Sequence, residues 1–205
     1  MENQMNNNSV ILSGKIGKNA IYSHEVYGES FYESSIQVER LSSQIDNIPI
    51  TISERLMEEV KVEKGEFITL EGQFRSYNKM VDERSKLMLT VFVRNCSENY
   101  EEKNENCVEL SGFICKPPIY RVTPFNREIA DVLVAVNRAY NKSDYIPCIA
   151  WGRNARFASH LEVGDKINLV GRIQSREYQK VLENGVEETR TAYEISISRI
   201  SYAEE

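Results

Sequence analysis

Aromatic and arginine residues follow one another in the segment DYIPCIAWGRNARF, which spans residues 144–157 and holds the single tryptophan, Trp151. Tyr145 and Trp151 are six positions apart, so in a regular β-strand both rings leave the same face. Arg153 is predicted to follow on that face, and Arg156 comes three residues later. Flat rings stack on planar groups and guanidinium groups pair with phosphates. The segment therefore predicts a surface for a ligand that is planar and anionic.

The same mixture of rings and guanidinium groups continues in the two neighbouring strand-like segments. Residues of equal parity are Arg138 and Tyr140 before the segment, and Arg172, Arg176 and Tyr178 after it. A base stacked on an aromatic ring contributes about 1 to 3 kcal/mol whatever its identity, and cations attract the backbone phosphates. Together the residues predict sequence-tolerant binding of an unpaired nucleic-acid strand. For any one tyrosine, packing within the fold or at a subunit contact is the alternative.

Enzymatic chemistry has no matching motif in this sequence. The patterns G-x-x-x-x-G-K-[ST], H-E-x-x-H and G-x-S-x-G do not occur. The two histidines, His24 and His160, and the four cysteines form no cluster with the spacing of metal ligands. We therefore expect a protein that is not an enzyme, with no cofactor, no metal and reduced thiols.

Length and composition limit the class of protein further. The chain has 205 residues, 41% of them hydrophobic, which is enough to bury a core in one large or two small domains. No stretch approaches the roughly 20 apolar residues that a membrane span requires. The N-terminal sequence MENQMNNNS lacks the pattern of a signal peptide. We expect a cytoplasmic protein without a membrane partner.

An internal repeat organises the chain. Residues 10–55 align with 108–153 at a constant shift of 98, with 14 of 46 positions identical, and residues 65–76 then match 164–175. The chain is therefore read as two copies of one unit of about 95 residues. The predicted parts are an N-terminal domain at 8–97, a polar linker at 98–106 and a C-terminal domain at 107–202.

Each unit has the pattern of a small β-barrel. Short segments of β-type residues alternate in polarity or carry a glycine where a bulge or bend is expected. Residues 53–65 and 152–164 are helix candidates, each ended by a glycine. About five curved strands with one short helix between the third and fourth describe the oligonucleotide/oligosaccharide-binding (OB) fold. The predicted fold class is all-β with one short helix per unit, as two tandem OB-fold Greek-key barrels.

The second unit resembles the bacterial single-stranded DNA-binding protein family. The resemblance lies in VELSGFI, VAVNRAY, DYIPCIAWGRNA, LEVGDKINLVGRIQSREY and TAYEISIS, over about 95 residues. It implies that bases stack on four aromatic residues, namely Tyr140, Tyr145, Trp151 and Tyr178. With these rings we group five candidate phosphate contacts, Arg138, Arg153, Arg156, Arg172 and Arg176.

The resemblance also implies partners. It predicts single-stranded DNA as the ligand, in replication, recombination or repair, with proteins of those processes as further partners. Family members assemble four barrels, so two chains of two barrels would form a homodimer. Two alternatives stay open, a scaffold or regulatory OB protein with little nucleic-acid binding, and an RNA-binding OB protein.

The first unit keeps the barrel pattern and lacks the rings. The positions aligned with the four aromatic residues are Ser42, Asn47, Ser53 and Lys79. Residues 1–104 carry 12 basic and 17 acidic side chains, a balance of −5, whereas 105–205 carry 13 and 14, a balance of −1. An acidic surface repels phosphate. We expect the first domain to contact protein, either a partner subunit or its sister domain.

Overall fold

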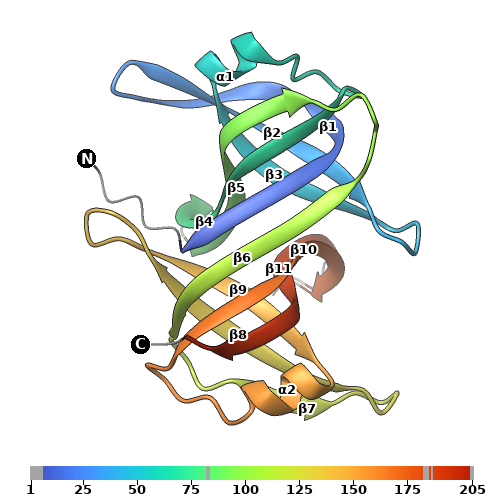
Figure 1. Cartoon of the computed structure of the whole chain (residues 1–205), viewed down its shortest axis with the longest axis vertical. Helices are drawn as coiled ribbons and strands as arrows, with labels where there is room; N and C mark the ends of the chain where they lie inside the picture. The colour runs from blue at the N-terminus through green and yellow to red at the C-terminus, as the bar shows by residue number, and fades with distance from the viewer. Residues whose placement is uncertain (1–6, 82–83, 182–184, 186, 204–205) are drawn as a thin grey trace.

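Two β-barrels stand one above the other in the computed structural model, which describes residues 7–81, 84–181, 185 and 187–203 (Figure 1). The elements of the first barrel are β1 (Asn8–Val26), β2 (Glu29–Glu39), β3 (Ile45–Ser53), α1 (Glu54–Glu59), β4 (Phe67–Val81) and β5 (Arg84–Glu98). Those of the second are β6 (Glu105–Ile114), β7 (Ile119–Val122), β8 (Glu128–Asn137), β9 (Ser143–Trp151), α2 (Arg153–Ala158), β10 (Lys166–Val181) and β11 (Glu187–Tyr202). Residues 99–104 connect β5 to β6, and the domain boundaries given above stay predictions.

Each barrel closes in the strand order of an OB-fold. In the first, β1 pairs with both β2 and β4, β2 with β3, and β4 with β5, all antiparallel, while β3 and β5 are parallel. In the second, β6 pairs with β8 and β10, and the parallel contact joins β9 to β11. A single short helix follows β3 and β9. The predicted fold class is confirmed.

A glycine lets the first strand of each barrel bend across its neighbour. Gly14 lies where β1 changes partner from β4 to β2. A Cβ atom there would stand 2.2 Å from the carbonyl oxygen of Gln37, and one on Gly112 would stand 2.5 Å from that of Ala135. No side chain fits such an approach, so the repeated glycine in LSG is a requirement of barrel closure.

The helices are shorter than the sequence predicted. α1 ends at Glu59 and α2 at Ala158, well before Gly65 and Gly164. In the first barrel Val60 already has extended backbone angles, and both Val60 and Val62 are buried. Apolar side chains at these positions reach the core from an extended chain, so core packing ends the helix before the glycine.

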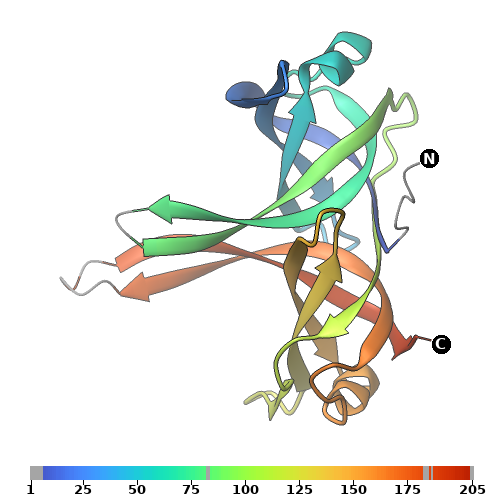
Figure 2. The same cartoon turned by 90° about the vertical axis from the view of Figure 1, so that its left-hand side faces the viewer.

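An antiparallel pairing of β1 with β6 joins the barrels into one sheet of eleven strands. Its register sets Val10 opposite Val108, which are equivalent positions of the repeat. The two copies are therefore related by an approximate two-fold axis through this pair, and contacts of one barrel with the other can recur at equivalent positions. The long hairpins β4–β5 and β10–β11 project side by side from the same side of the molecule (Figure 2).

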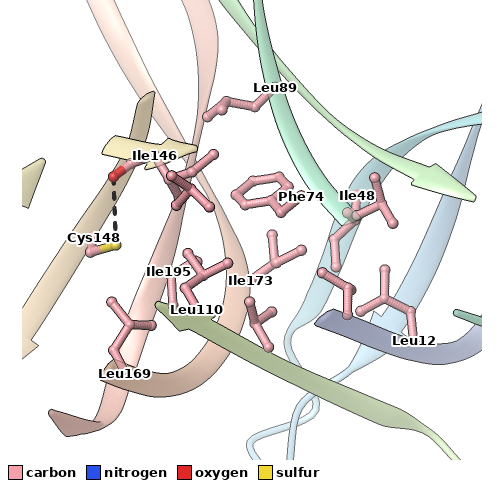
Figure 3. Close-up of a cluster of buried hydrophobic side chains, with 14 of the residues drawn as sticks. Leu12, Ile48, Phe74, Leu89, Leu110, Ile146, Cys148, Leu169, Ile173 and Ile195 are labelled. Carbon is pink, nitrogen blue, oxygen red and sulfur yellow. Dashed lines mark hydrogen bonds between the residues drawn. The ribbon is translucent and has the colours of Figure 1, made fainter. Parts of the chain in front are cut away.

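Buried side chains of both barrels form one hydrophobic cluster. Figure 3 shows Phe74 of β4 within it, together with Ile48 of the first barrel and with Ile146 and Ile173 of the second. Phe74, Ile48, Ile146 and Ile173 have no exposed surface. Because apolar burial drives folding, this shared core predicts that the two barrels stabilise one another.

A buried carboxylate links each barrel to the hairpin of the other. Asp46 at the start of β3 is fully buried and accepts hydrogen bonds from Arg40 of its own barrel (Nε, 2.8 Å) and from Arg172 of the second (Nη2, 2.8 Å). The backbone N–H of Ser175 on β10 also donates to Asp46, at 2.8 Å. Burial alone would raise the pKa of Asp46, but these donors outweigh it and the pKa is lowered.

Asp144 occupies the equivalent place in the second barrel and is less well paired. It accepts a hydrogen bond from the backbone N–H of Ser76 on β4 at 2.7 Å, and Arg138 approaches its Oδ2 only to 3.4 Å. Within the described residues, Oδ2 accepts no hydrogen bond. Burial therefore dominates, and the pKa of Asp144 is raised. Arg75 is also partly buried, and this burial, followed by the nearby positive charge of Arg138, lowers the pKa of Arg75 to about 10.

We predict that removing the charge of Asp46 lowers the free energy of unfolding more than removing the charge of Asp144. Asp46→Asn should lower the free energy of unfolding at pH 7 by about 3 kcal/mol, the low end for breaking a buried ion pair, since both arginines keep contact with water. Asp144→Asn should cost less, because burial already disfavours its charge. A folded-state pKa below the ordinary 3.8 means that the contribution of Asp46 is complete above pH 3.8 and is lost as pH falls through the folded pKa.

Urea unfolding of wild type and both variants between pH 7 and pH 3 tests this prediction. The difference in free energy of unfolding between wild type and Asp46→Asn should become smaller as the pH falls towards 3. Equal losses for the two variants at pH 7 would contradict the assignment.

Candidate nucleic-acid interface

The outer face of β8 and β9 carries the predicted rings of Tyr145 and Trp151. Residues of β9 alternate between the core and the outside, and Tyr145 and Trp151 are 47% and 40% exposed. Tyr145 pairs with Ala135 of β8, and Trp151 pairs with Ile129. The two rings thus stand towards opposite ends of one sheet face, with the half-buried Pro147 between them on the same side.

Trp151 is the last residue of β9, and the chain turns away immediately after it. Gly152 has φ +52° and ψ −119°, a conformation that residues with a Cβ atom avoid. Arg153 then begins α2. The expectation that Arg153 continues along the face of the strand was therefore wrong in its geometry, although its side chain is exposed beside Trp151 in the chain.

Tyr140 lies in the turn between β8 and β9 and is 85% exposed, with φ +60°. Since β8 ends at Asn137, the parity argument that placed Tyr140 beside Arg138 does not apply. Arg138 instead turns back towards Asp144. A ring at a hairpin tip is free to approach a ligand from the side of the sheet.

Tyr178 lies on β10, in the projecting part of the hairpin with β11, and is 39% exposed. Its cross-strand partner is Arg190. The register is regular from Gly171 onward, so Arg172, Arg176 and Tyr178 share one face of the hairpin as parity requires.

The five arginines predicted to contact phosphate differ in what they already contact. Arg138 and Arg172 face the buried carboxylates between the barrels, and Arg156 pairs with Glu128 at 2.8 Å. Arg153 and Arg176 are exposed and have no carboxylate within 4.0 Å among the described residues. These two are the candidates that a phosphate can reach without breaking an ion pair.

Glu128 adds a negative charge at the rim of the face. Its carboxylate accepts hydrogen bonds from the Tyr120 hydroxyl at 2.7 Å and from Arg156 at 2.8 Å. The hydroxyl of Tyr120 and then Arg156 lower the pKa of Glu128. Arg156 therefore stands beside a carboxylate that stays ionised at neutral pH.

The sequence reasoning missed Phe113 on this face. Phe113 of β6 pairs with Ala135, which pairs in turn with Tyr145, so the three residues form one row across three strands. Phe113 is 37% exposed. The available signal was the repeat, which aligns Phe113 with Lys15 and thus marks a ring present in the second copy alone.

At the position equivalent to Trp151, the first barrel has buried side chains in place of an exposed ring. Ser53 pairs with Phe31, and both are buried. The ring of Phe31 contacts Phe92 at 5.6 Å between centroids and His24 at 5.2 Å, while the Arg75 guanidinium lies 4.1 Å above Phe92. These rings pack on one another, so they offer less open π-surface than those of the second barrel.

Within residues 7–81, 84–181, 185 and 187–203, no group of three or more His, Cys, Asp or Glu side chains could hold a metal ion. Over the same residues no helix is long and apolar enough to span a bilayer.

Two closed five-stranded barrels in one chain, with exposed rings on the second, define an OB-fold protein. The profile of the single-strand binding protein family matches residues 105–202. Single-stranded DNA-binding protein B of Bacillus subtilis (strain 168) is 34% identical over 88 residues, which are 40% of this chain and 76% of that protein. The chain belongs to the single-strand binding protein family.

Other relatives extend the comparison. A single-stranded DNA-binding protein of Bacillus cereus is 35% identical over 81 residues, 36% of this chain and 48% of that protein, so the chain spans about half the length of such relatives. The crystal structure of a deletion mutant of the single-stranded DNA binding protein from Thermus aquaticus matches 97% of this chain and 95% of that one, with a TM-score of 0.74 and 20% identity. That similarity establishes a shared two-barrel fold.

The backbone at Gly152 leads to a prediction about Trp151. Gly152→Ala should cost on the order of 1 to 2 kcal/mol of stability, because a Cβ atom disfavours this conformation, and it should shift the emission maximum of the neighbouring tryptophan. Gly28→Ala at the tip of the β1–β2 hairpin, where φ is +82°, is the matched control. It should show a similar loss in urea unfolding with unchanged emission. Equal spectral effects of both substitutions would refute the prediction.

Proposed function

We propose that this chain is a non-catalytic protein that binds single-stranded DNA with little regard to sequence. The observation that carries the proposal is the exposure of the four predicted rings, between 39% and 85%, on the second barrel and its hairpin. Rings buried in the fold would leave no place for a base. Family membership supports the same function.

In this proposal each group has a distinct role. Tyr145, Trp151, Tyr140 and Tyr178 stack on successive bases, and Phe113 extends the row beside Tyr145. Arg153 and Arg176 contact phosphates directly, whereas Arg138, Arg156 and Arg172 contribute only if they leave their carboxylate partners. Because the net charge of the chain is −6, stacking rather than charge must supply most of the binding free energy.

We further propose a homodimer of two-barrel chains that acts in replication, recombination or repair, together with proteins of those processes. The proposal rests on the family, whose members assemble four barrels. Light scattering at micromolar concentration measures the mass directly, and a monomer would refute the dimer.

Tryptophan fluorescence gives a direct test of binding. Oligo-dT should quench the emission of Trp151, since the base stacks on its ring, and added salt should reverse the effect with a slope of about 0.7 per neutralised phosphate. A DNA duplex of equal length should leave the emission unchanged. An unchanged signal with oligo-dT and no band shift would favour the scaffold, while preference for oligo-rU would favour RNA.

Alanine variants distinguish the contribution of the predicted stacking rings from that of an exposed tyrosine elsewhere in the chain. Tyr145→Ala and Tyr178→Ala should each weaken oligo-dT binding by about 5- to 150-fold, which corresponds to one lost base stack. Tyr100→Ala is the matched control, because Tyr100 is 87% exposed in the connection between the barrels. Affinity should be measured by fluorescence titration at fixed salt. Equal losses for all three variants would contradict the assigned site.

A further inference from the structure

The backbone of Tyr145 is held by a residue of the first barrel. The N–H of Tyr145 donates a hydrogen bond of 2.8 Å to the hydroxyl oxygen of Ser76 on β4. Pairing between β9 and β11 covers Cys148 and Ile149, so Tyr145 lies before the point where a second strand meets this edge of β9. Ser76 thus supplies the partner that the neighbouring strand does not provide.

Ser76 makes a second hydrogen bond to β9. Its backbone N–H donates to Asp144, the residue before Tyr145, at 2.7 Å, and Ser76 as a whole residue is only 6% exposed. The two hydrogen bonds therefore join adjacent residues of β9 to a single residue of β4. Two consecutive residues of the strand are thus held, so the direction in which the Tyr145 side chain leaves the strand is restricted as well.

The approximate two-fold axis provides an internal comparison. Ser175 on β10 makes the equivalent contacts in the first barrel, accepting from the N–H of Asn47 at 3.2 Å and donating its own N–H to Asp46 at 2.8 Å. Asn47 is the residue aligned with Tyr145 and has no ring. The same pair of hydrogen bonds thus holds Tyr145, a predicted stacking residue, in the second barrel and the non-aromatic Asn47 in the first.

We propose that Ser76 is a positioning residue for the ligand face, through which the first barrel orients the ring of Tyr145 for stacking. This inference rests on the proposed function, because it assigns to the first barrel a part in the binding at the second. It also specifies the contact with the sister domain that the acidic first unit was expected to make. Ser76 acts through Tyr145 and does not itself touch the ligand.

A double-mutant cycle with oligo-dT tests the inference on the full chain. Ser76→Ala should weaken binding by about 2- to 10-fold, the change expected when one hydrogen bond is lost. In a Tyr145→Ala background the same substitution should change affinity by less than about 2-fold, because there is no ring left to orient. Ser76→Thr keeps the hydroxyl and should restore binding in the presence of Tyr145.

Ser175→Ala is the matched control, since it breaks the equivalent contact to Asn47. It should destabilise the chain in urea about as much as Ser76→Ala and weaken binding less. Equal weakening by both substitutions, or an undiminished effect of Ser76→Ala without the ring, would overturn the positioning role. Wild-type protein that does not bind oligo-dT would refute the proposed function itself. Binding that falls with Tyr145→Ala but not with Ser76→Ala would refute the positioning role alone.

Discussion

The antiparallel pairing of β1 with β6 is the constraint on which the arrangement of this molecule depends. By setting Val10 opposite Val108, it relates two copies of one sequence by an approximate two-fold axis within a single chain. Contacts that a homodimer would make between subunits are here made between repeats. Asp46 therefore meets Ser175 just as Asp144 meets Ser76. A covalently joined pair differs from a homodimer in that each copy can change separately.

The two copies differ in their exposed rings and in the pairing of their buried carboxylates. In the first, Ser53 stands where the second has Trp151, and it is buried beside Phe31, whose ring packs against those of His24 and Phe92. Asp46 accepts more hydrogen bonds and has a lowered pKa, while Asp144 is incompletely paired and has a raised pKa. The first copy thus carries the better stabilised of the two joints, and the second carries the exposed rings. In the proposed function, stability and ligand binding are placed in different copies.

Much of this architecture follows from the sequence, because the repeat and the two-residue period of strands are local signals. They predict the all-β fold, the short helix of each unit and the outward direction of Tyr145 and Trp151. Contacts between the copies have no such signal. Arg172 shares parity with Tyr178, yet it pairs with Asp46, which is 126 residues away in the chain. Likewise, periodicity gave no reason for the strand to end at Trp151, since Gly152 determines that turn through its positive φ.

The placement of the arginines bears on what kind of ligand the second barrel suits. Arg138, Arg156 and Arg172 are each engaged by a carboxylate, so a long polyanion gains less from them than their number indicates. In the sheet face itself, the row of Phe113, Ala135 and Tyr145 is uncharged. Duplex DNA presents its phosphates and hides the faces of its bases, whereas an unpaired strand presents both. In the proposed function, a face with many rings and few available cations therefore favours the unpaired strand, and selection depends on access to the bases rather than on their order.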